Sequence, residues 1–271
     1  MQRNIYNQLL RWKNKKTRKP LILNGARQVG KTYILREFGQ NEYQKVVFFS
    51  LDRDQKVREV FEKSGSTADI LMALSAISQV DITPGDTLLV LDEIQDCPKA
   101  LEALKFFCEE TPDIHIVVAG SLLGLSLHDG TSYPVGKVEE MRLYPMTFLE
   151  FLNAMGKTQL VEIIENKKWA VVNMLQMELI GLLRQYYYVG GMPAAVLAHV
   201  EHNSLQEIRS IQLQILADYR RDFSKHAPAR EVPRINMVWD SIPPQLAKEN
   251  KKFIYGALKK SARAKDFEIA I

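Results

Sequence analysis

Four residues near the start of this 271-residue sequence have the spacing of a phosphate-binding loop: Gly25, Gly30, Lys31 and Thr32. They satisfy every required position of the Walker A pattern G-x-x-x-x-G-K-[ST]. Glycines let the backbone approach phosphate closely, and successive N–H groups at a helix start form an anion cradle. Lys31 would bring positive charge to the β- and γ-phosphates, and the Thr32 hydroxyl would coordinate Mg²⁺. We expect the nucleotide to contact Gly25, Ala26, Arg27, Gln28, Val29, Gly30, Lys31, Thr32 and Tyr33.

Two adjacent carboxylates, Asp92 and Glu93, end an apolar run about 60 residues after the glycine loop. This is the placement of a Walker B pair. An aspartate there can hold Mg²⁺ opposite Thr32, usually through water. A glutamate directly after it can orient the attacking water or accept its proton. We predict these roles for Asp92 and Glu93; the alternative is a pair of exposed acids at a strand end.

Ser121 follows the next apolar run, where related ATPases keep a polar residue that senses the γ-phosphate or its water. We count it among the catalytic candidates with Glu93 and Lys31, although it could instead cap the following helix. His115 fits a packed strand residue better than a catalytic one. The other histidines show no spacing typical of a metal site: His128, His199, His202 and His226.

A strand, a loop and a helix must position the phosphate site. Residues 20–24 form a short apolar run typical of a buried parallel strand, and residues 33–38 have helical spacing before Gly39. Further strands are predicted at residues 45–51, 87–95, 114–121 and 137–143. Helices are predicted between them, with starts near Asp52 and Ser66 and with one helix over residues 98–110 that begins at Pro98. Apolar strands alternating with helices predict an α/β fold with a parallel five-stranded sheet sandwiched by helices.

From Tyr144 the pattern becomes helical. Helices are predicted after Thr147, at about residues 168–188 and at about residues 204–225. The prolines Pro228, Pro233, Pro243 and Pro244 are expected to break the chain into short pieces before a basic helical end. We predict three parts: residues 1–144 as the core with a short N-terminal helix, 145–245 as a helical domain, and 246–271.

Composition is that of an ordinary globular protein, with 46% hydrophobic and 25% charged residues. No apolar run approaches the roughly 20 residues that a membrane helix needs. Cys97 and Cys108 suggest neither a disulfide framework nor a zinc site, so we expect a cytoplasmic protein with reduced thiols. Basic residues crowd the two ends, where they could contact DNA or an acidic protein or simply face solvent. They are Arg11, Lys13, Lys15, Lys16, Arg18, Lys19, Lys248, Lys251, Lys252, Lys259, Lys260, Arg263 and Lys265.

Several segments resemble prokaryotic AAA-type P-loop ATPases that are coupled to an uncharacterised C-terminal domain. They are residues 19–32, 91–95, 143–152 and 188–193. The resemblance implies an ASCE-type core with a strand inserted between the Walker A and Walker B strands. It also implies ATP rather than GTP, since nothing here resembles the Asn-Lys-x-Asp guanine motif. Residues 246–271 resemble the start of a winged-helix-like segment, which in such proteins leads into a nuclease-like domain. We therefore expect this sequence to be a truncated form.

The leading hypothesis for function is Mg²⁺-dependent ATP hydrolysis coupled to conformational change. Two alternatives stay open: an ATP-loaded switch with little turnover, and a DNA-associated regulatory module. A metabolite kinase fits less well, since no arginine-rich lid is evident. Hydrolysis could also need a homo-oligomer, with an arginine finger supplied by another subunit. Arg142 is the preferred donor; Arg27 lies in the loop itself, and Arg220 and Arg221 are flanked by acids that predict surface ion pairs.

Overall fold

The computed structural model of the chain describes residues 1–63, 65–121, 133–250, 252–259 and 261–270. Contacts divide it into two compact units, Met1–Ile211 and Gln212–Ile271. In the part of the chain that is described, no helix combines the length and the apolar character needed to cross a membrane.

Five parallel strands form the sheet of the first unit. They are β1 (Leu21–Gly25), β2 (Lys45–Ser50), β3 (Thr87–Asp92), β4 (His115–Gly120) and β5 (Glu139–Leu143). Their order is β2-β3-β4-β1-β5, and every neighbouring pair is parallel. The strands β1, β3 and β4 are buried along their whole length, as expected where helices cover both faces. The predicted α/β fold is confirmed, including β4 as the strand inserted between β1 and β3.

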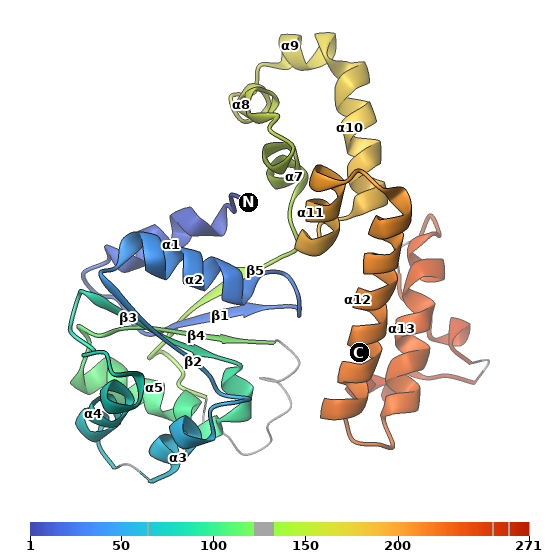
Figure 1. Ribbon diagram of the computed structural model, residues 1–271. Coiled ribbons are helices and arrows are strands. Elements are labelled where there is room, and N and C mark those ends of the chain that lie inside the picture. The colour runs from blue at the N-terminus through green and yellow to red at the C-terminus, as the bar shows by residue number, and fades with distance from the viewer. Residues whose placement is uncertain (64, 122–132, 251, 260, 271) are drawn as a thin grey trace. The chain divides into compact units, whose positions relative to one another are not determined.

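Helices pack two separate apolar clusters onto the two faces of the sheet (Figure 1). On one face lie α1 (Ile5–Lys13) and α2 (Lys31–Glu42), which bury Leu9, Trp12 and Phe38. On the other lie α3 (Gln55–Lys63), α4 (Thr67–Ser78) and α5 (Pro98–Glu110). The predicted helix starts are confirmed: Ser66 caps α4 by accepting from the Asp69 amide, and Pro98 lies in the first turn of α5.

A helical segment follows β5 in the same unit. It contains α7 (Phe148–Ala154), α8 (Thr158–Glu165), α9 (Trp169–Met174), α10 (Gln176–Val189), α11 (Pro193–Glu201) and the start of α12 (Leu205–His226). The helix predicted after Thr147 is confirmed, and Thr147 and Glu150 form a reciprocal capping box at its start. The helix predicted at about residues 204–225 is α12.

The single helix predicted at residues 168–188 is wrong, and α8 was not predicted. Leu175 separates α9 from α10, because its side chain packs against a small cluster formed with α8, which includes Leu160 and Val161. Such tertiary packing overrides local helical propensity, so the periodicity of the sequence alone does not show the break.

The second unit contains the remainder of α12 and α13 (Val232–Leu246). Trp239 of α13 stacks on Tyr219 and meets the edge of Phe223, at centroid distances of 5.7 and 5.2 Å. Short 3₁₀ turns follow at Tyr255–Ala257, Ala264–Asp266 and Glu268–Ala270. The basic helical end predicted here is wrong for the described residues 252–259 and 261–270, where these turns are the helical elements.

The expectation that four prolines break the chain is confirmed for Pro228, which lies between α12 and α13, and is wrong for the other three. Pro233 lies in the first turn of α13, where a helix leaves N–H groups without intrahelical partners in any case. Pro243 and Pro244 lie inside the same helix, close to its end. Side-chain bonds support that end: Ser241 donates to the Val238 carbonyl at 2.7 Å, and Gln245 donates to Ser241 at 3.0 Å.

The contact boundary after Ile211 differs from the predicted part boundaries at 144/145 and 245/246. An apolar cluster joins Met1 to α7, α11 and the start of α12, so the sheet and the helices up to Ile211 form one compact unit. The division at residue 145 and the winged-helix-like character of residues 246–271 stay predictions about sequence modules.

Candidate functional site

The glycine loop joins β1 to α2 and has the backbone geometry that its sequence predicts. Gly30, at the N-terminus of α2, has a φ of +96°, in the left-handed region that favours glycine. Gln28 also has a positive φ, 63°, which is uncommon for a residue with a side chain. A Cβ on Gly25 would lie 2.5 Å from the Leu143 carbonyl oxygen, so β5 leaves room only for glycine there. The buried Val29 side chain anchors the loop to the core.

The Lys31 ammonium lies within the loop. It donates to the carbonyl oxygens of Gly25 and Ala26 at 2.9 and 3.0 Å. Burial lowers the pKa of Lys31, while the nearby Glu93 and Asp92 carboxylates act in the opposite direction. A phosphate oxygen would be a stronger partner for this cation than two neutral carbonyls, because charge-assisted hydrogen bonds are the stronger ones. The lysine is therefore placed to bind an anion at the loop.

Thr32 and Asp92 are the residues predicted to hold Mg²⁺, and the structure brings them together. The Thr32 hydroxyl donates to Asp92 Oδ2 at 2.6 Å across 60 residues of sequence. Burial raises the pKa of Asp92, opposed by the hydrogen bond from Thr32. A hydroxyl and a carboxylate are the hard oxygen ligands that Mg²⁺ prefers alongside water and phosphate. The residues present therefore fit a magnesium–nucleotide complex.

Glu93 follows Asp92 in a strained conformation. Its φ is 54°, in the left-handed region, and such outliers cluster at functional sites. Its Oε2 accepts from Gln95 Nε2 at 2.5 Å, and its backbone N–H donates to Asp92 Oδ1 at 3.1 Å. Gln95 is buried and fixes the Glu93 carboxylate. The sequence analysis missed this role of Gln95, for which its distance of two residues from Glu93 was the available signal.

Ser121 lies directly after β4, and its side chain is buried. The strand β4 lies between β1 and β3, and Gly120 pairs with Asn24. Ser121 is therefore at the end of the sheet where β1 and β3 deliver the loop and Asp92. Its role at a γ-phosphate stays a prediction.

The histidines do not form a metal site in the described residues, where no group of three or more His, Cys, Asp or Glu side chains is suited to one. His115 is buried beside Tyr43, with the Tyr43 hydroxyl 2.6 Å from its Nδ1, and burial lowers its pKa to about 4. This confirms the packed role expected for it. His202 pairs with Glu207 at 2.9 Å, and His199 stacks on Phe151. His128 lies outside the described residues.

An apolar cavity of about 300 Å³ is lined in part by Gly30 and Tyr33, which the sequence predicts as nucleotide contacts. The sequence did not indicate its other wall residues. Its walls include Met1, Arg3, Tyr33, Met146, Pro193 and Leu197. These residues come from both ends of the first unit, so no local pattern could have indicated the cavity. The available signal was the Gly-Gly-Met-Pro segment at residues 190–193, because its last residue, Pro193, forms part of the cavity wall.

The arginines considered as fingers lie in different surroundings. Arg142 is exposed on β5, at an edge of the sheet, with its guanidinium 5.9 Å from the Tyr144 ring centroid. Arg221 pairs with Asp218 at 3.0 Å, and Arg220 pairs with Asp240. The surface ion pairs expected for Arg220 and Arg221 are therefore confirmed. The partner of Arg220 is Asp240 on α13, not a neighbouring acid on its own helix.

Two family models match the chain. One, described as an AAA domain, matches residues 17–152, and one described as a domain of unknown function matches residues 180–271. No curated protein matches the sequence.

Solved structures match the chain at low sequence identity. The Walker-type ATPase Paby2304 of Pyrococcus abyssi aligns over 96% of this chain and 87% of its own, with 15% identity and a TM-score of 0.52. A structure of Drosophila ORC bound to DNA aligns over 92% and 68%, with 14% identity and a TM-score of 0.45. The RuvB protein of Thermotoga maritima aligns over 58% and 50%, with 19% identity and a TM-score of 0.39.

Proposed function

We propose that this chain, which belongs to the AAA domain family, binds ATP with Mg²⁺ at its glycine loop and hydrolyses the bond to the γ-phosphate. The observation that carries the proposal is the 2.6 Å contact between Thr32 and Asp92, beside the Lys31 ammonium. This contact brings together, from segments that are distant in sequence, the two side chains proposed to hold Mg²⁺. The fold by itself does not assign an activity, so these side-chain contacts are the support for hydrolysis.

Each residue then has a task in hydrolysis. Lys31 exchanges its carbonyl partners for phosphate oxygens, and the N–H groups of the loop and of α2 surround the same anion. Thr32 and Asp92 would hold Mg²⁺, which would supply positive charge to neutralise the phosphates. Glu93 accepts the proton of the attacking water, and Gln95 keeps its carboxylate in place. Ser121 would contact the γ-phosphate or that water.

The apolar cavity beside Gly30 is where we place the adenine base. A pocket that is mainly apolar suits the flat faces of a purine, and the exposed Tyr33 ring is available to stack on it. ATP is preferred to GTP because the sequence has no Asn-Lys-x-Asp guanine motif.

Lys31→Ala should weaken ATP binding by roughly 10- to 150-fold, which corresponds to about 1.5–3 kcal/mol for hydrogen bonds to a charged group. The loop loses the cation that faces the β- and γ-phosphates. Calorimetric titration with Mg·ATP and Mg·GTP measures the affinities and tests the proposed function at the same time. Lys63→Ala is the matched control, because Lys63 is exposed and pairs only with its neighbour Glu59 in the contacts described. Equal affinities for Lys31→Ala and the wild type would contradict the placement of the phosphates.

The hydrolysis step is proposed to need a second subunit. Arg142 is the preferred finger, since it is exposed on an edge strand, where a neighbouring copy has access. Turnover per subunit should then rise with protein concentration, and Arg142→Ala should remove that rise without loss of ATP binding. Arg53→Ala, at another exposed arginine, should behave like the wild type. A high turnover that does not change on dilution would contradict a finger supplied in trans.

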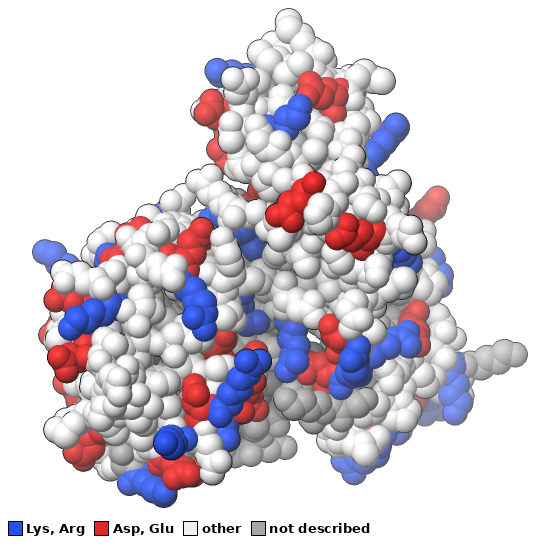
Figure 2. All heavy atoms as spheres, in the orientation of Figure 1, with Lys and Arg blue, Asp and Glu red and all other residues white. Residues whose placement is uncertain are grey.

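A DNA-associated switch with little turnover is the alternative. In the N-terminal basic stretch, Lys15 pairs with Glu139 at 2.9 Å, and Lys19 donates to the Gly136 carbonyl at 2.6 Å. Over the sheet and its helices, Figure 2 shows Lys and Arg side chains lying among Asp and Glu rather than in one continuous patch. The described basic residues near the C-terminus, such as Lys248 and Arg263, are exposed. Lys251 and Lys260 lie outside the described residues. A DNA affinity that falls steeply with salt would favour this alternative.

A further inference from the structure

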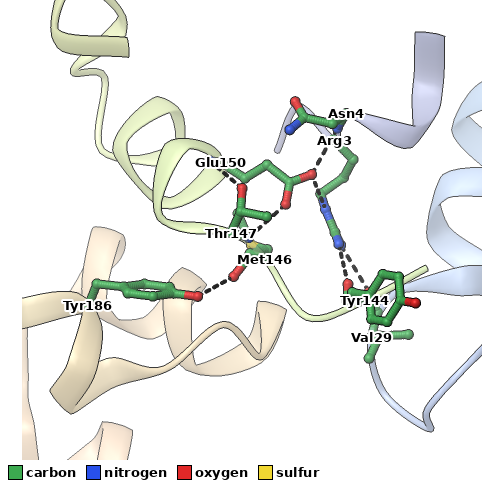
Figure 3. Close-up of polar contacts among 8 residues, drawn as sticks. All are labelled: Arg3, Asn4, Val29, Tyr144, Met146, Thr147, Glu150 and Tyr186. Carbon is green, nitrogen blue, oxygen red and sulfur yellow. Dashed lines mark hydrogen bonds and ion pairs between the residues drawn. The ribbon is translucent and has the colours of Figure 1, made fainter. Parts of the chain in front are cut away.

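Arg3 is a buried arginine whose side chain contacts three separate segments of the first unit (Figure 3). Its Nη1 donates to the Val29 carbonyl in the glycine loop at 3.0 Å. Its Nη2 donates to the Tyr144 carbonyl at 2.6 Å, and its Nε donates to Glu150 Oε1 at 3.1 Å. One guanidinium thus joins the glycine loop, the segment after β5, and α7.

Glu150 is the second member of this arrangement and is as buried as Arg3, with 5% of its side chain exposed. Besides Arg3, its Oε1 accepts from the Asn4 backbone N–H at 2.8 Å. Its Oε2 accepts from the Thr147 N–H at 2.8 Å, which completes the capping box of α7. The same carboxylate therefore holds Arg3 and fixes the first turn of α7.

Contacts continue from this turn into the helical segment. The Met146 carbonyl accepts from the Tyr186 hydroxyl of α10 at 2.8 Å, and the Met146 N–H donates to the Gly191 carbonyl at 2.6 Å. A Cβ on Gly191 would lie 2.3 Å from the Met146 carbonyl oxygen, so the two backbones touch. The path from Val29 to α10 and α11 is therefore made of direct contacts.

The contact with Val29 bears on the chemistry of the loop. The Val29 carbonyl belongs to the same rigid peptide unit as the Gly30 N–H, one of the loop's anion-binding groups. In a trans peptide the two bonds point in opposite directions, so a hydrogen bond that fixes the carbonyl also fixes the N–H. Any turn of this peptide on nucleotide binding changes the contact with Arg3.

We propose that Arg3 is a positioning residue that couples the glycine loop to α7: it orients the Val29–Gly30 peptide for phosphate and passes changes in the loop to Glu150. The coupling to nucleotide rests on the proposed function; the link between the loop and α7 does not. The arrangement requires arginine, because a planar fork reaches three acceptors at once. A lysine keeps the charge near Glu150 but has one nitrogen for all three.

Hydrogen–deuterium exchange with the full chain tests the coupling through Arg3→Lys, with Arg11→Lys as the control at an exposed arginine of α1. In the wild type, a saturating non-hydrolysable ATP analogue with Mg²⁺ should slow exchange both in the loop and in residues 146–155. In Arg3→Lys the loop should still respond, the response at 146–155 should be lost, and affinity should fall roughly tenfold, as for one charge-assisted hydrogen bond. A retained response at 146–155 in Arg3→Lys, or a wild-type response confined to the loop, would overturn the proposal.

A second comparison needs no nucleotide. In the free protein, Arg3→Lys should speed exchange of the amides at 29–31 and of those at 147–150 together. Faster exchange at only one of the two places would overturn the coupling. If the analogue changes the exchange rate of no amide even in the wild type, the proposed function fails. The comparison without nucleotide still tests whether Arg3 links the loop to α7. Should Arg3→Lys not fold, Glu150→Gln weakens the link at α7 and retains the bond from Arg3 to Val29. With the analogue, the loop of that variant must then still respond, and the response at 146–155 must be lost.

Discussion

The Glu93→Gln variant should bind ATP like the wild type and hydrolyse it roughly 10²–10⁴ times more slowly, the loss typical of removing a general base. Glutamine has nearly the shape of glutamate and can still pair with Gln95, but it cannot take a proton from water. The Thr32–Asp92 pair and the lysine within the loop are untouched by the change. The variant should therefore lose hydrolysis and keep ATP binding.

Single-turnover phosphate release and calorimetric titration measure the two properties on the same sample. Glu102→Gln is the matched control, since Glu102 makes a surface pair with Lys99 on α5 and should leave both properties unchanged. Undiminished turnover in Glu93→Gln would mean that Glu93 is not the general base and has a structural role only. Loss of ATP binding in that variant would mean instead that its carboxylate helps to hold the nucleotide complex.

Arg3→Met should lower the free energy of unfolding of the first unit by about 3–5 kcal/mol, the cost of removing one partner from a buried ion pair. Methionine fills much of the volume but leaves the Glu150 carboxylate buried without its cation. It also leaves the Val29 and Tyr144 carbonyls without their donor. Adding Glu150→Gln should recover part of the loss, because the unpaired charge is then removed.

Urea unfolding followed by the fluorescence of Trp12 reports on this unit, since Trp12 is buried in it. Trp169 and Trp239 are replaced by Phe in all variants, so that Trp12 is the remaining indole. Arg11→Met is the control, because Arg11 is exposed and the change should stay within about 0.5 kcal/mol. A loss below about 1 kcal/mol in Arg3→Met, or no recovery in the double variant, would contradict the importance of the buried pair.

The parts of the fold that could be predicted are those that local patterns determine. The glycine loop follows an apolar run and precedes a helix, and this order alone predicts β1, the loop and α2. The helix from Pro98 to Glu110 was predicted with its observed bounds, because a proline start and apolar periodicity agree there. The break at Leu175 and the uninterrupted α13 could not be predicted, since packing against α8 and side-chain bonds near Ser241 decide them.

The residues of the candidate site likewise fall into those that a local motif indicates and those that only the fold brings together. Lys31, Thr32 and Asp92 lie in motifs whose chemistry fixes their spacing, so the sequence could indicate them. Arg3 and Glu150 are 147 residues apart. Arg3 lies in no motif, and the capping-box spacing of Glu150 from Thr147 does not indicate a distant partner. Only the fold shows that the N-terminal residues reach the glycine loop. The left-handed conformation of Glu93 was likewise beyond sequence reasoning, because a glutamate gives no signal for a positive φ.

Release of phosphate from ATP by the wild-type chain, in Mg²⁺ and in EDTA, is the most direct test of hydrolysis at the Lys31–Thr32–Asp92 site. The measurement is made at a high protein concentration, so that a finger supplied by a second copy is available. Release should be steady with Mg²⁺, fall to background in EDTA, and return when Mg²⁺ is restored in excess. Equal release in EDTA, or release no greater than that of Lys31→Ala, would contradict Mg²⁺-dependent hydrolysis at this loop.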